Sequence, residues 1–461
     1  MDFNFLESLE FPWSTEESQN WVMEDFPPSL WSTEGSQSWD MEEEEELQQY
    51  AWNQVDGVLS MDSSFSTQNS CTVEFGACDS GQVTMTNAPS ELACNELSLA
   101  HLLKAHAEAT EAEHTRLMEV IQTCVLDQAG PVGETTERLS FYLFKPQPQY
   151  SYLKQESQPN FDVAYKAFYQ LFPYGRVPHI AANSAILEAL PAHAGTFNIV
   201  DFDMGDGVQW APLIDTLARQ NKELSLMAIK WAEDDDFEDT RRRLESHARS
   251  VAAKLRVQEV AMEDLVSEVK RISKRCAQAP WFAFNCMVSL PHMIKGRSEE
   301  KVRQFLTVAK DLLGDSTNCG MITFGEGEAD ANKQTNLSNY SSFFERQLAR
   351  HQALLESVEW TFSEQQLEAK VAIECLFLAP SITSHGWLQK WEHMNEEGNV
   401  RAAAATLGLE GLRLGQTTLT EANKLVRRGE DSSYKLRLGE DENEMVLEWR
   451  GTPLVRLSTW R

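Results

Sequence analysis

The chain has 461 residues, of which 42% are hydrophobic, and a formal net charge of −31. This length allows one large domain or two ordinary ones with a sizeable core. Residues 1–103 carry 20 Asp and Glu and no Lys or Arg, so the acidity is concentrated in an amino-terminal tail. Generic affinity for nucleic acid comes from Lys and Arg, which argues against the chain as a stand-alone DNA-binding protein. Any DNA contact is expected to be weak, or indirect through a partner.

Neither a signal peptide nor a membrane span is expected. The amino terminus has no basic region before an apolar run, and no stretch of about 18 apolar residues occurs. The eight cysteines include no Cys-x-x-Cys pair and no Cys/His spacing typical of zinc. We therefore expect an intracellular protein without a metal site, whose cysteines are thiols.

Residues 1–90 form one compositional unit that is acidic and rich in isolated aromatic residues. They contain a short repeat whose tryptophans are Trp13, Trp21, Trp31 and Trp39. Clustered apolar surface is too scarce to offset chain entropy, so this region is predicted to be disordered when alone. Acidic residues that keep aromatic side chains solvated are typical of activation segments that fold onto a coactivator. A solubilising tail is the alternative interpretation.

Helical signals begin near residue 92 and define a leucine-rich region over residues 91–130. Leu99 and Leu103 lie at helical spacing on one face, and the segment Leu99–Leu103 also matches an L-x-x-L-L docking helix. The candidate partner-binding residues are Leu99, Leu102, Leu103, Leu117 and Ile121. A plain core seam is the alternative for this face.

The next helical region covers residues 161–196. A helix is predicted over Phe161–Leu171, with Pro173 and Gly175 as a break and Ala181–Leu190 as the continuation.

Strands and helices then alternate. Strands are predicted over Phe197–Phe202, Leu224–Trp231, Trp281–Val288 and Met321–Phe324. Helices are predicted over Ala211–Gln220, Thr240–Ala253, Met262–Ala277, Lys301–Leu313, Phe343–Leu355 and Glu364–Leu376. This alternation indicates an α/β fold, a parallel sheet with helices on both faces. Three later strands, 434–438, 445–449 and 453–460, are expected to be antiparallel at one edge of the sheet.

The first of these strands runs into a glycine turn of the kind that holds nucleotide cofactors. The strand and turn contain Ile199, Val200, Asp201, Asp203, Gly205 and Gly207. Glycines there let the backbone approach a ligand at the carboxyl end of the sheet. The pattern resembles the first motif of S-adenosylmethionine-dependent methyltransferases, so such an enzyme is an alternative function.

Several observations argue against a working cofactor site. The second strand ends in Lys230-Trp231, where an acid normally holds the ribose hydroxyls, and Trp210 is near enough to fill an adenosine-sized space. Asp201 and Asp203 are therefore expected to cap the following helix and shape the turn.

No catalytic group converges either. Asn285-Cys286 lacks the motif that follows it in methyltransferases, and His292 stands alone. No catalytic residue and no cofactor is expected.

Together these segments resemble the plant GRAS family of transcriptional regulators, from about residue 92 to Arg461. The motifs occur in family order: Leu97–Ala109, Phe168–Leu190, Asn198–Phe202, Gly207–Trp210, Asn285–His292 and Ser458–Trp460. Asp-x-Gly-x-Gly-Val-Gln-Trp and Asn-Cys-Met-x-x-Leu-Pro are most similar to the nodulation-signalling-pathway-two subgroup, also called scarecrow-like.

The resemblance implies a Rossmann-like, methyltransferase-like core with an α-helical cap, and no catalysis. It implies homo- or heterodimers with other GRAS proteins, assembly with DNA-binding transcription factors, residence in the nucleus, and a role in symbiotic or strigolactone-linked signalling. The chain is accordingly divided into the acidic region 1–90 and a GRAS domain 91–461, whose α/β core is 197–461. A scaffold without activating function is a further alternative.

Two features qualify the resemblance. Ala372-Ile373-Glu374-Cys375 stands where the family has Arg-Val-Glu-Arg, so the salt bridges of those arginines do not carry over. The basic stretches Arg241–Arg243 and Lys270–Arg275 are interpreted either as nuclear-import or DNA-phosphate contacts, or as solvated helix faces.

Overall fold

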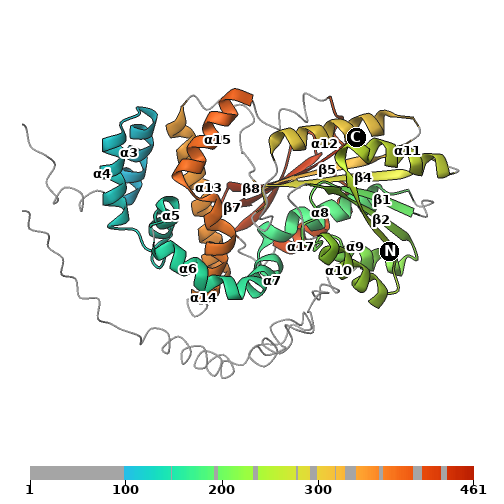
Figure 1. The fold of residues 1–461 in the computed structure, drawn as a ribbon, viewed down its shortest axis with the longest axis horizontal. Helices are drawn as coiled ribbons and strands as arrows, with labels where there is room; N and C mark the ends of the chain where they lie inside the picture. The colour runs from blue at the N-terminus through green and yellow to red at the C-terminus, as the bar shows by residue number, and fades with distance from the viewer. Residues whose placement is uncertain are drawn as a thin grey trace, which may run out of the picture.

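The computed structural model describes residues 98–146, 148–191, 196–231, 237–276, 279–290, 298–316, 318–327, 339–362, 367–397, 408–426 and 433–461. The acidic region with Trp13, Trp21, Trp31 and Trp39 lies outside the described residues, as does His292. An eight-stranded sheet with its helices lies at one end of the molecule, and a group of helices forms the other end (Figure 1).

The sheet has the strand order β3-β2-β1-β4-β5-β8-β7-β6. Its parallel strands are β1 (Thr196–Asp201), β2 (Glu223–Lys230), β3 (Lys254–Ala261), β4 (Trp281–Val288) and β5 (Cys319–Glu326). Antiparallel strands continue it beyond β5: β6 (Tyr434–Leu438), β7 (Glu444–Trp449) and β8 (Thr452–Trp460). The predicted Rossmann-like, methyltransferase-like sheet with antiparallel edge strands is confirmed. Its order reverses between β1 and β4, where doubly wound sheets bind ligands.

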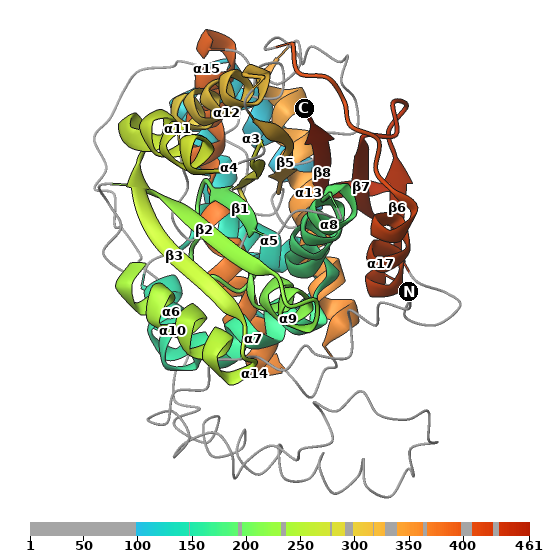
Figure 2. The ribbon, with the colours of Figure 1, turned by 90° about the vertical axis from the view of Figure 1, so that its right-hand side faces the viewer.

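Helices cover both faces of the parallel strands, as predicted (Figure 2). On one face α9 (Ala211–Arg219) and α10 (Phe237–Ser250) bring Leu213 and Leu244 into the main apolar core. On the other, α11 (Leu265–Arg275) and α12 (Glu299–Gly314) bring Val269 and Phe305 into a second core. Because both faces are covered, β1 and β4 are buried along almost their whole length, and β4 is almost continuously apolar.

The helical cap is built from two separate parts of the sequence. Before β1 it contains α3 (Leu99–Glu111), α4 (Thr115–Leu126), α5 (Thr135–Phe144), α6 (Gln149–Ser157), η3 (Gln158–Asn160) and α7 (Phe161–Leu171). After β5 it contains α13 (Tyr340–Thr361), α14 (Leu367–Ile373) and α15 (Ser384–Glu397). The long helix α13 contacts α3, α5 and α15 as well as β8, so it joins the cap to the sheet.

Helices α8 (Pro173–Ala189) and α17 (Gln416–Val426) lie side by side, and α8 packs on β5 and β8. The Glu188 carboxylate accepts hydrogen bonds from the backbone amide of Thr417 at 3.3 Å and of Thr418 at 3.1 Å. The first amides of a helix have no intrahelical partner, so Glu188 caps α17 and ties the two helices together.

The predicted leucine-rich region contains two helices, α3 and α4, and Glu113 adopts φ +57° between them. One helix prediction after this region was wrong in detail. Pro173 begins α8 instead of breaking a helix, since proline suits the first turn, where its missing N–H would have no partner. Gly175 lies within the same turn, and a Cβ there would stand 3.1 Å from the ring of Phe168.

A polar edge strand was missed between the predicted helices Thr240–Ala253 and Met262–Ala277. Residues Lys254–Ala261 form β3, which pairs in parallel with β2 at the end of the sheet. The two helices themselves are confirmed as α10 and, after the short turn η4 (Met262–Asp264), α11.

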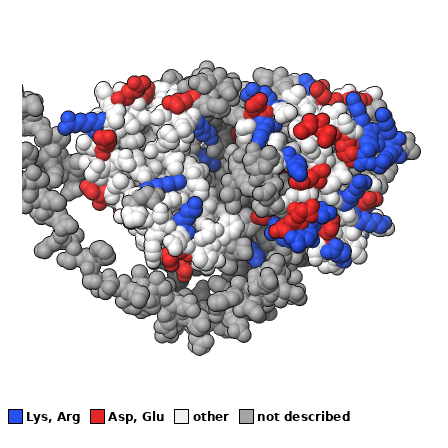
Figure 3. Space-filling view, in the orientation of Figure 1, with Lys and Arg blue, Asp and Glu red and all other residues white. Residues whose placement is uncertain are grey.

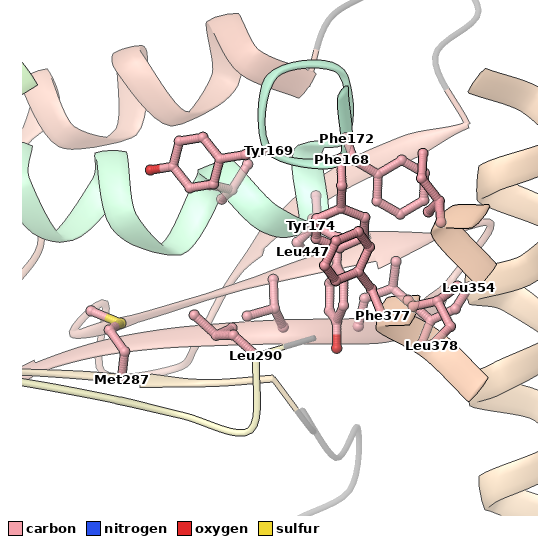
Figure 4. Close-up of a cluster of buried hydrophobic side chains, with 14 of the residues drawn as sticks. Phe168, Tyr169, Phe172, Tyr174, Met287, Leu290, Leu354, Phe377, Leu378 and Leu447 are labelled. Carbon is pink, nitrogen blue, oxygen red and sulfur yellow. The ribbon is translucent and has the colours of Figure 1, made fainter. Parts of the chain in front are cut away.

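One helical run among the described residues, Leu367–Glu392, is long and apolar enough to cross a membrane. More than half of it is buried inside the protein, and it is interrupted by the π-helix η6 (Glu374–Leu378) and the turn η7 (Ala379–Ser381). In Figure 4 Phe377 of η6 lies against Phe168 from α7, with ring centroids 5.3 Å apart. These contacts are those of a core helix that anchors the cap.

The cysteines agree only in part with the expectation of thiols. Cys276, Cys286, Cys319 and Cys375 are free thiols, the first and third of them exposed. Cys124 in α4 is disulfide-bonded, contrary to that expectation. The expectation rested on local spacing, which does not report on bonds between distant cysteines.

Candidate functional site

The signature strand β1 ends in a buried carboxylate, Asp201, whose two oxygens accept hydrogen bonds from other side chains of the chain. Asp201 Oδ2 accepts a 2.6 Å hydrogen bond from the Trp210 indole, and Oδ1 accepts a 2.9 Å bond from the Asn285 amide. Burial raises the pKa of Asp201 to about 7, although both hydrogen bonds act to lower it. Asp201 thus bonds an indole rather than a helix amide: α9 has no side-chain cap, so that part of the prediction was wrong.

Neutral side chains extend this bonding between β1, β4, β5 and α8. Asn285 Oδ1 accepts hydrogen bonds from Thr323 at 2.8 Å and from Gln209 at 3.2 Å. Asn183 donates to the Gln209 carbonyl at 2.6 Å. We call these residues the signature cluster: Asn183, Asp201, Gln209, Trp210, Asn285 and Thr323. All of them are buried, so the cluster fastens α8 and the turn to the sheet at the position of the ligand-binding switch point.

The glycine turn after β1 is closed over by α10. Gly205 and Gly207 have φ of +49° and +74°, in the left-handed region that favours glycine. A Cβ at Gly207 would stand 3.1 Å from both Leu244 and Thr240. Thr240 also donates to the Gly205 carbonyl at 2.9 Å. Side chains of this chain therefore occupy the close-approach position that glycines leave for a cofactor in nucleotide-binding turns.

The end of β2 is closed in a related way. Lys230 is exposed and pairs with Glu259 of β3 at 3.5 Å, so it does not point into the site. Trp231 turns back and donates its indole N–H to the Phe202 carbonyl at 2.7 Å. Its ring meets that of Phe202 at 5.3 Å, edge to face, and Lys301 lies over it at 4.9 Å. Trp231 thus covers the carboxyl end of β1.

The remaining signature residues have structural positions. Ile199 and Val200 are fully buried on opposite faces of β1, one in each apolar core. Asp203 is half-buried within the turn and contributes a hydrogen bond to Asp201 through its backbone. The described residues contain no group of three His, Cys, Asp or Glu that could hold a metal ion.

Most of the candidate partner-binding residues lie inside the cap. Leu99, Leu102, Leu103 and Ile121 are buried, and α3 packs against α4 and α13. Leu117 is 49% exposed on α4. In the isolated chain only this member of the predicted set can be reached by a partner.

A second polar cluster lies within the cap, where it joins α5 to the later helices α13 and α14, and sequence reasoning missed it. Arg138 of α5 and Glu374 of η6 are both fully buried, with Nε and Oε1 3.3 Å apart. Arg138 also bonds Glu359 of α13 at 3.0 Å, and Lys370 lies 3.9 Å from Glu359. We call Arg138, Tyr142, Glu359, Lys370 and Glu374 the cap ion cluster.

The cap ion cluster is incompletely satisfied. Neither oxygen of Glu374 has a partner in good hydrogen-bond geometry among the described residues, although Arg138 and the Tyr142 hydroxyl lie close enough to act on its pKa. Burial raises the pKa of Glu374 to about 7, against the opposing effect of Arg138. Glu374 had been noted only for the arginines missing beside it; its actual cation comes from a helix far away in the sequence.

The comparison with protein families agrees with the order of the sequence motifs. The GRAS domain family model matches residues 99–461. The chain belongs to the GRAS domain family. This membership confirms the resemblance inferred from the motifs, and the homologues are plant transcriptional regulators.

Similar GRAS proteins include two that are named for nodulation signalling. The chain is 27% identical over 306 residues to Protein NODULATION SIGNALING PATHWAY 2 of Medicago truncatula, spanning 64% of this chain and 58% of that protein. It is 27% identical over 395 residues to the protein of the same name from Lotus japonicus, spanning 79% of this chain and 76% of that one. The crystal structure of SCL7 from Oryza sativa has the same fold, with a TM-score of 0.54 and 21% identity, covering 79% of this chain and all of that one.

Proposed function

We propose that this GRAS protein is a non-enzymatic transcriptional co-regulator of symbiosis- or strigolactone-related genes. It acts in the nucleus by assembling with other GRAS proteins and with DNA-binding factors. The observation that carries the non-enzymatic part is the switch point filled by the chain's own side chains. Trp210 donates its indole N–H to Asp201, and Trp231 donates to the carbonyl of Phe202, the residue after β1, where a cofactor would need both space and partners.

The division of labour follows the two-part organisation of the chain. Region 1–90 recruits the transcription machinery, and the GRAS domain 91–461 binds partners. Fused to a heterologous DNA-binding domain, residues 1–90 are expected to activate a reporter, and changing Trp13, Trp21, Trp31 and Trp39 to Ala is expected to abolish activation. Trp52→Ala, a tryptophan of the same region outside the repeat, is the matched control. An inert fusion would instead favour the scaffold without activating function.

The alternative function is an S-adenosylmethionine-dependent methyltransferase, favoured only by the strand and glycine turn. Titration calorimetry of the full chain with S-adenosylmethionine is expected to give no heat of specific binding. Micromolar binding that Asp203→Ala abolishes would contradict the non-enzymatic proposal.

Partner binding through the leucine-rich region is assigned to the exposed side of α4. Leu117 and Val120 are 49% and 45% exposed and lie one helical turn apart. Leu117→Glu with Val120→Glu is expected to abolish pull-down of a GRAS partner while the chain stays folded. Tyr152→Glu, at another exposed apolar residue of the cap, is the control. Leu99→Glu with Leu103→Glu would not test this, because both side chains are buried and the cap would unfold.

A further inference from the structure

One edge of the sheet carries a concentration of cations. It is formed by Lys254 and Arg256 of β3 and by Lys270, Arg271, Lys274 and Arg275 of α11, which we call the basic edge. Helix α11 runs back along β3, so its last turn lies beside the first residues of the strand. The amide of Gln258 in β3 donates to Glu268 of α11 at 3.1 Å, which fixes the two elements side by side. Figure 3 shows Lys and Arg gathered at the end of the molecule where Figure 1 draws α11.

These cations are mostly unneutralised. Arg271 pairs with Glu268, while Lys254, Arg256, Lys270, Lys274 and Arg275 make no ion pair within the described residues. All five are exposed. Two acids lie beside these cations: Glu268, which pairs with Arg271 and is also close enough to Arg256 for its pKa to be lowered, and Glu223, the β2 residue in register with Lys254.

The other basic stretch of the sequence is different. Arg241, Arg242 and Arg243 pair with Glu238, Asp239 and Asp206 respectively. The charges of that stretch are therefore neutralised on the helix surface. Of the two basic stretches, only the basic edge keeps a positive potential.

Structural roles account for part of the basic edge. Lys274 and Arg275 offset the partial negative charge at the end of α11. Charged residues on an edge strand also discourage edge-to-edge pairing, which suits Lys254 and Arg256. Neither role pairs these cations with anionic side chains, so the basic edge can still attract a polyanion.

We propose that the acidic segment 1–97 of this same chain docks on the basic edge. The segment has 20 carboxylates and no Lys or Arg, whereas the chain as a whole is at −31, which opposes binding of a separate polyanion. Its tryptophans stand among acids, so they can stack on Arg256 and Arg275 while the carboxylates pair with the lysines.

The tether is long enough for this contact. A 97-residue coil has an end-to-end distance of about 55 Å, while a domain of this size has a radius of gyration of about 21 Å. Attachment in one chain gives the segment an effective concentration of up to about millimolar at the basic edge. The docked segment competes with phosphate groups of nucleic acid for the same cations. This holds whether or not residues 1–90 activate transcription.

Carbodiimide cross-linking of the full chain tests the contact, because it joins carboxylates to lysine amines only where they touch. Mass spectrometry is expected to find links from residues 1–97 to Lys254, Lys270 and Lys274, lost between about 0.05 M and 0.5 M salt. Lys435 on β6, at the opposite edge of the sheet, is the internal control. Links that reach Lys435 as often would overturn the proposal.

A charge variant that spares the reactive lysines sharpens the test. Arg256→Gln with Arg275→Gln is expected to lower the yield of links roughly threefold, since each exposed pair contributes modestly. Arg116→Gln with Arg413→Gln makes the same change of charge elsewhere and is expected to leave the yield unchanged.

Two outcomes would assign the basic edge to another occupant and contradict the proposal. Cross-links between isotopically labelled and unlabelled chains would identify a second copy. Unchanged tail links in the Arg256→Gln, Arg275→Gln chain, together with loss of binding to a short DNA duplex of arbitrary sequence, would identify nucleic acid.

Discussion

The signature cluster and the cap ion cluster are both buried, polar and remote in sequence, yet they are built differently. In the signature cluster one carboxylate, Asp201, is surrounded by neutral donors that satisfy both of its oxygens. In the cap ion cluster Glu374 faces the charge of Arg138, and neither of its oxygens has a partner in good hydrogen-bond geometry in the described part of the chain. A network whose polar groups are all hydrogen-bonded stabilises and specifies a fold. In a buried ion pair, by contrast, the attraction between the charges is largely offset by the free energy of removing them from water. The two regions should therefore respond differently to mutation.

The largest effect is expected from separating the buried ion pair. Arg138→Met leaves the Glu374 carboxylate buried without its cation, which is expected to lower the free energy of unfolding by about 3–5 kcal/mol. Arg138→Met with Glu374→Leu removes both charges and is expected to recover most or all of this loss. Urea unfolding of the full chain gives both values. Arg413→Met, at an exposed pair with Glu442, should cost no more than about 0.5 kcal/mol.

A double variant as unstable as Arg138→Met alone would break the comparison. It would mean that the pair itself contributes net stability, as the signature cluster does.

The next effect comes from removing one donor of the signature cluster. Trp210→Phe deletes the indole N–H that Asp201 accepts and is expected to cost about 2–3 kcal/mol. Trp449→Phe makes the same change of volume at a buried indole whose acceptor, Glu356, is 3.3 Å away and partly exposed. Its cost is expected to be about 1–2 kcal/mol smaller, because water can replace the lost donor there. Equal losses of unfolding free energy in the two variants would show that the change in side-chain volume, and not the lost hydrogen bond, sets the cost.

Local pattern was readable from the sequence, whereas the partners of buried polar groups were not. The bounds of α7 and β6 were predicted to the residue, because each has a clear apolar period and a clear end. The strand β3 was missed because an edge strand with Lys254 and Arg256 on one face looks like a loop.

Asp201 was singled out, but with the wrong role, and its hydrogen bond from Trp210 was not foreseen. Which atoms meet at the end of a strand depends on side-chain direction in three dimensions, not on spacing. Arg138 and Glu374 were not connected at all, since no local rule pairs residues from α5 and η6. The family motifs supplied the cap and the absence of catalysis as expectations, and these do not come from composition or periodicity.

A smaller effect is expected in the pH dependence of stability, where Asp201 and His351 act in opposite directions. Burial raises the pKa of Asp201 to about 7 from 3.8, so the folded chain holds a proton that the unfolded chain releases. This contribution to stability is complete below about pH 4 and is lost as pH rises towards 7. Buried His351, whose pKa burial lowers to about 3, acts in the opposite sense and loses its contribution as pH falls below 6.5.

Asp201→Asn is therefore expected to make the free energy of unfolding increase more steeply, or decrease less, between about pH 4 and 7 than in the parent. The difference in slope is at most about 1.4 kcal/mol per pH unit. His351→Gln should change the slope in the opposite direction. Parallel profiles for parent and Asp201→Asn would mean that the two hydrogen bonds to Asp201, rather than its burial, set its pKa.

The smallest effect lies in the glycine turn beside the signature cluster. Gly205 and Gly207 both have positive φ, so replacing either by Ala is expected to cost about 1 kcal/mol of backbone strain. Gly207→Ala adds a contact 3.1 Å from Leu244 and Thr240, whereas a Cβ at Gly205 meets nothing within 4 Å. The free energy of unfolding, measured by thermal unfolding, is therefore expected to be about 1 kcal/mol lower for Gly207→Ala than for Gly205→Ala. If instead the two variants are equal, α10 yields to the added methyl group, and the turn is held by the hydrogen bonds of the cluster rather than by the packing above it.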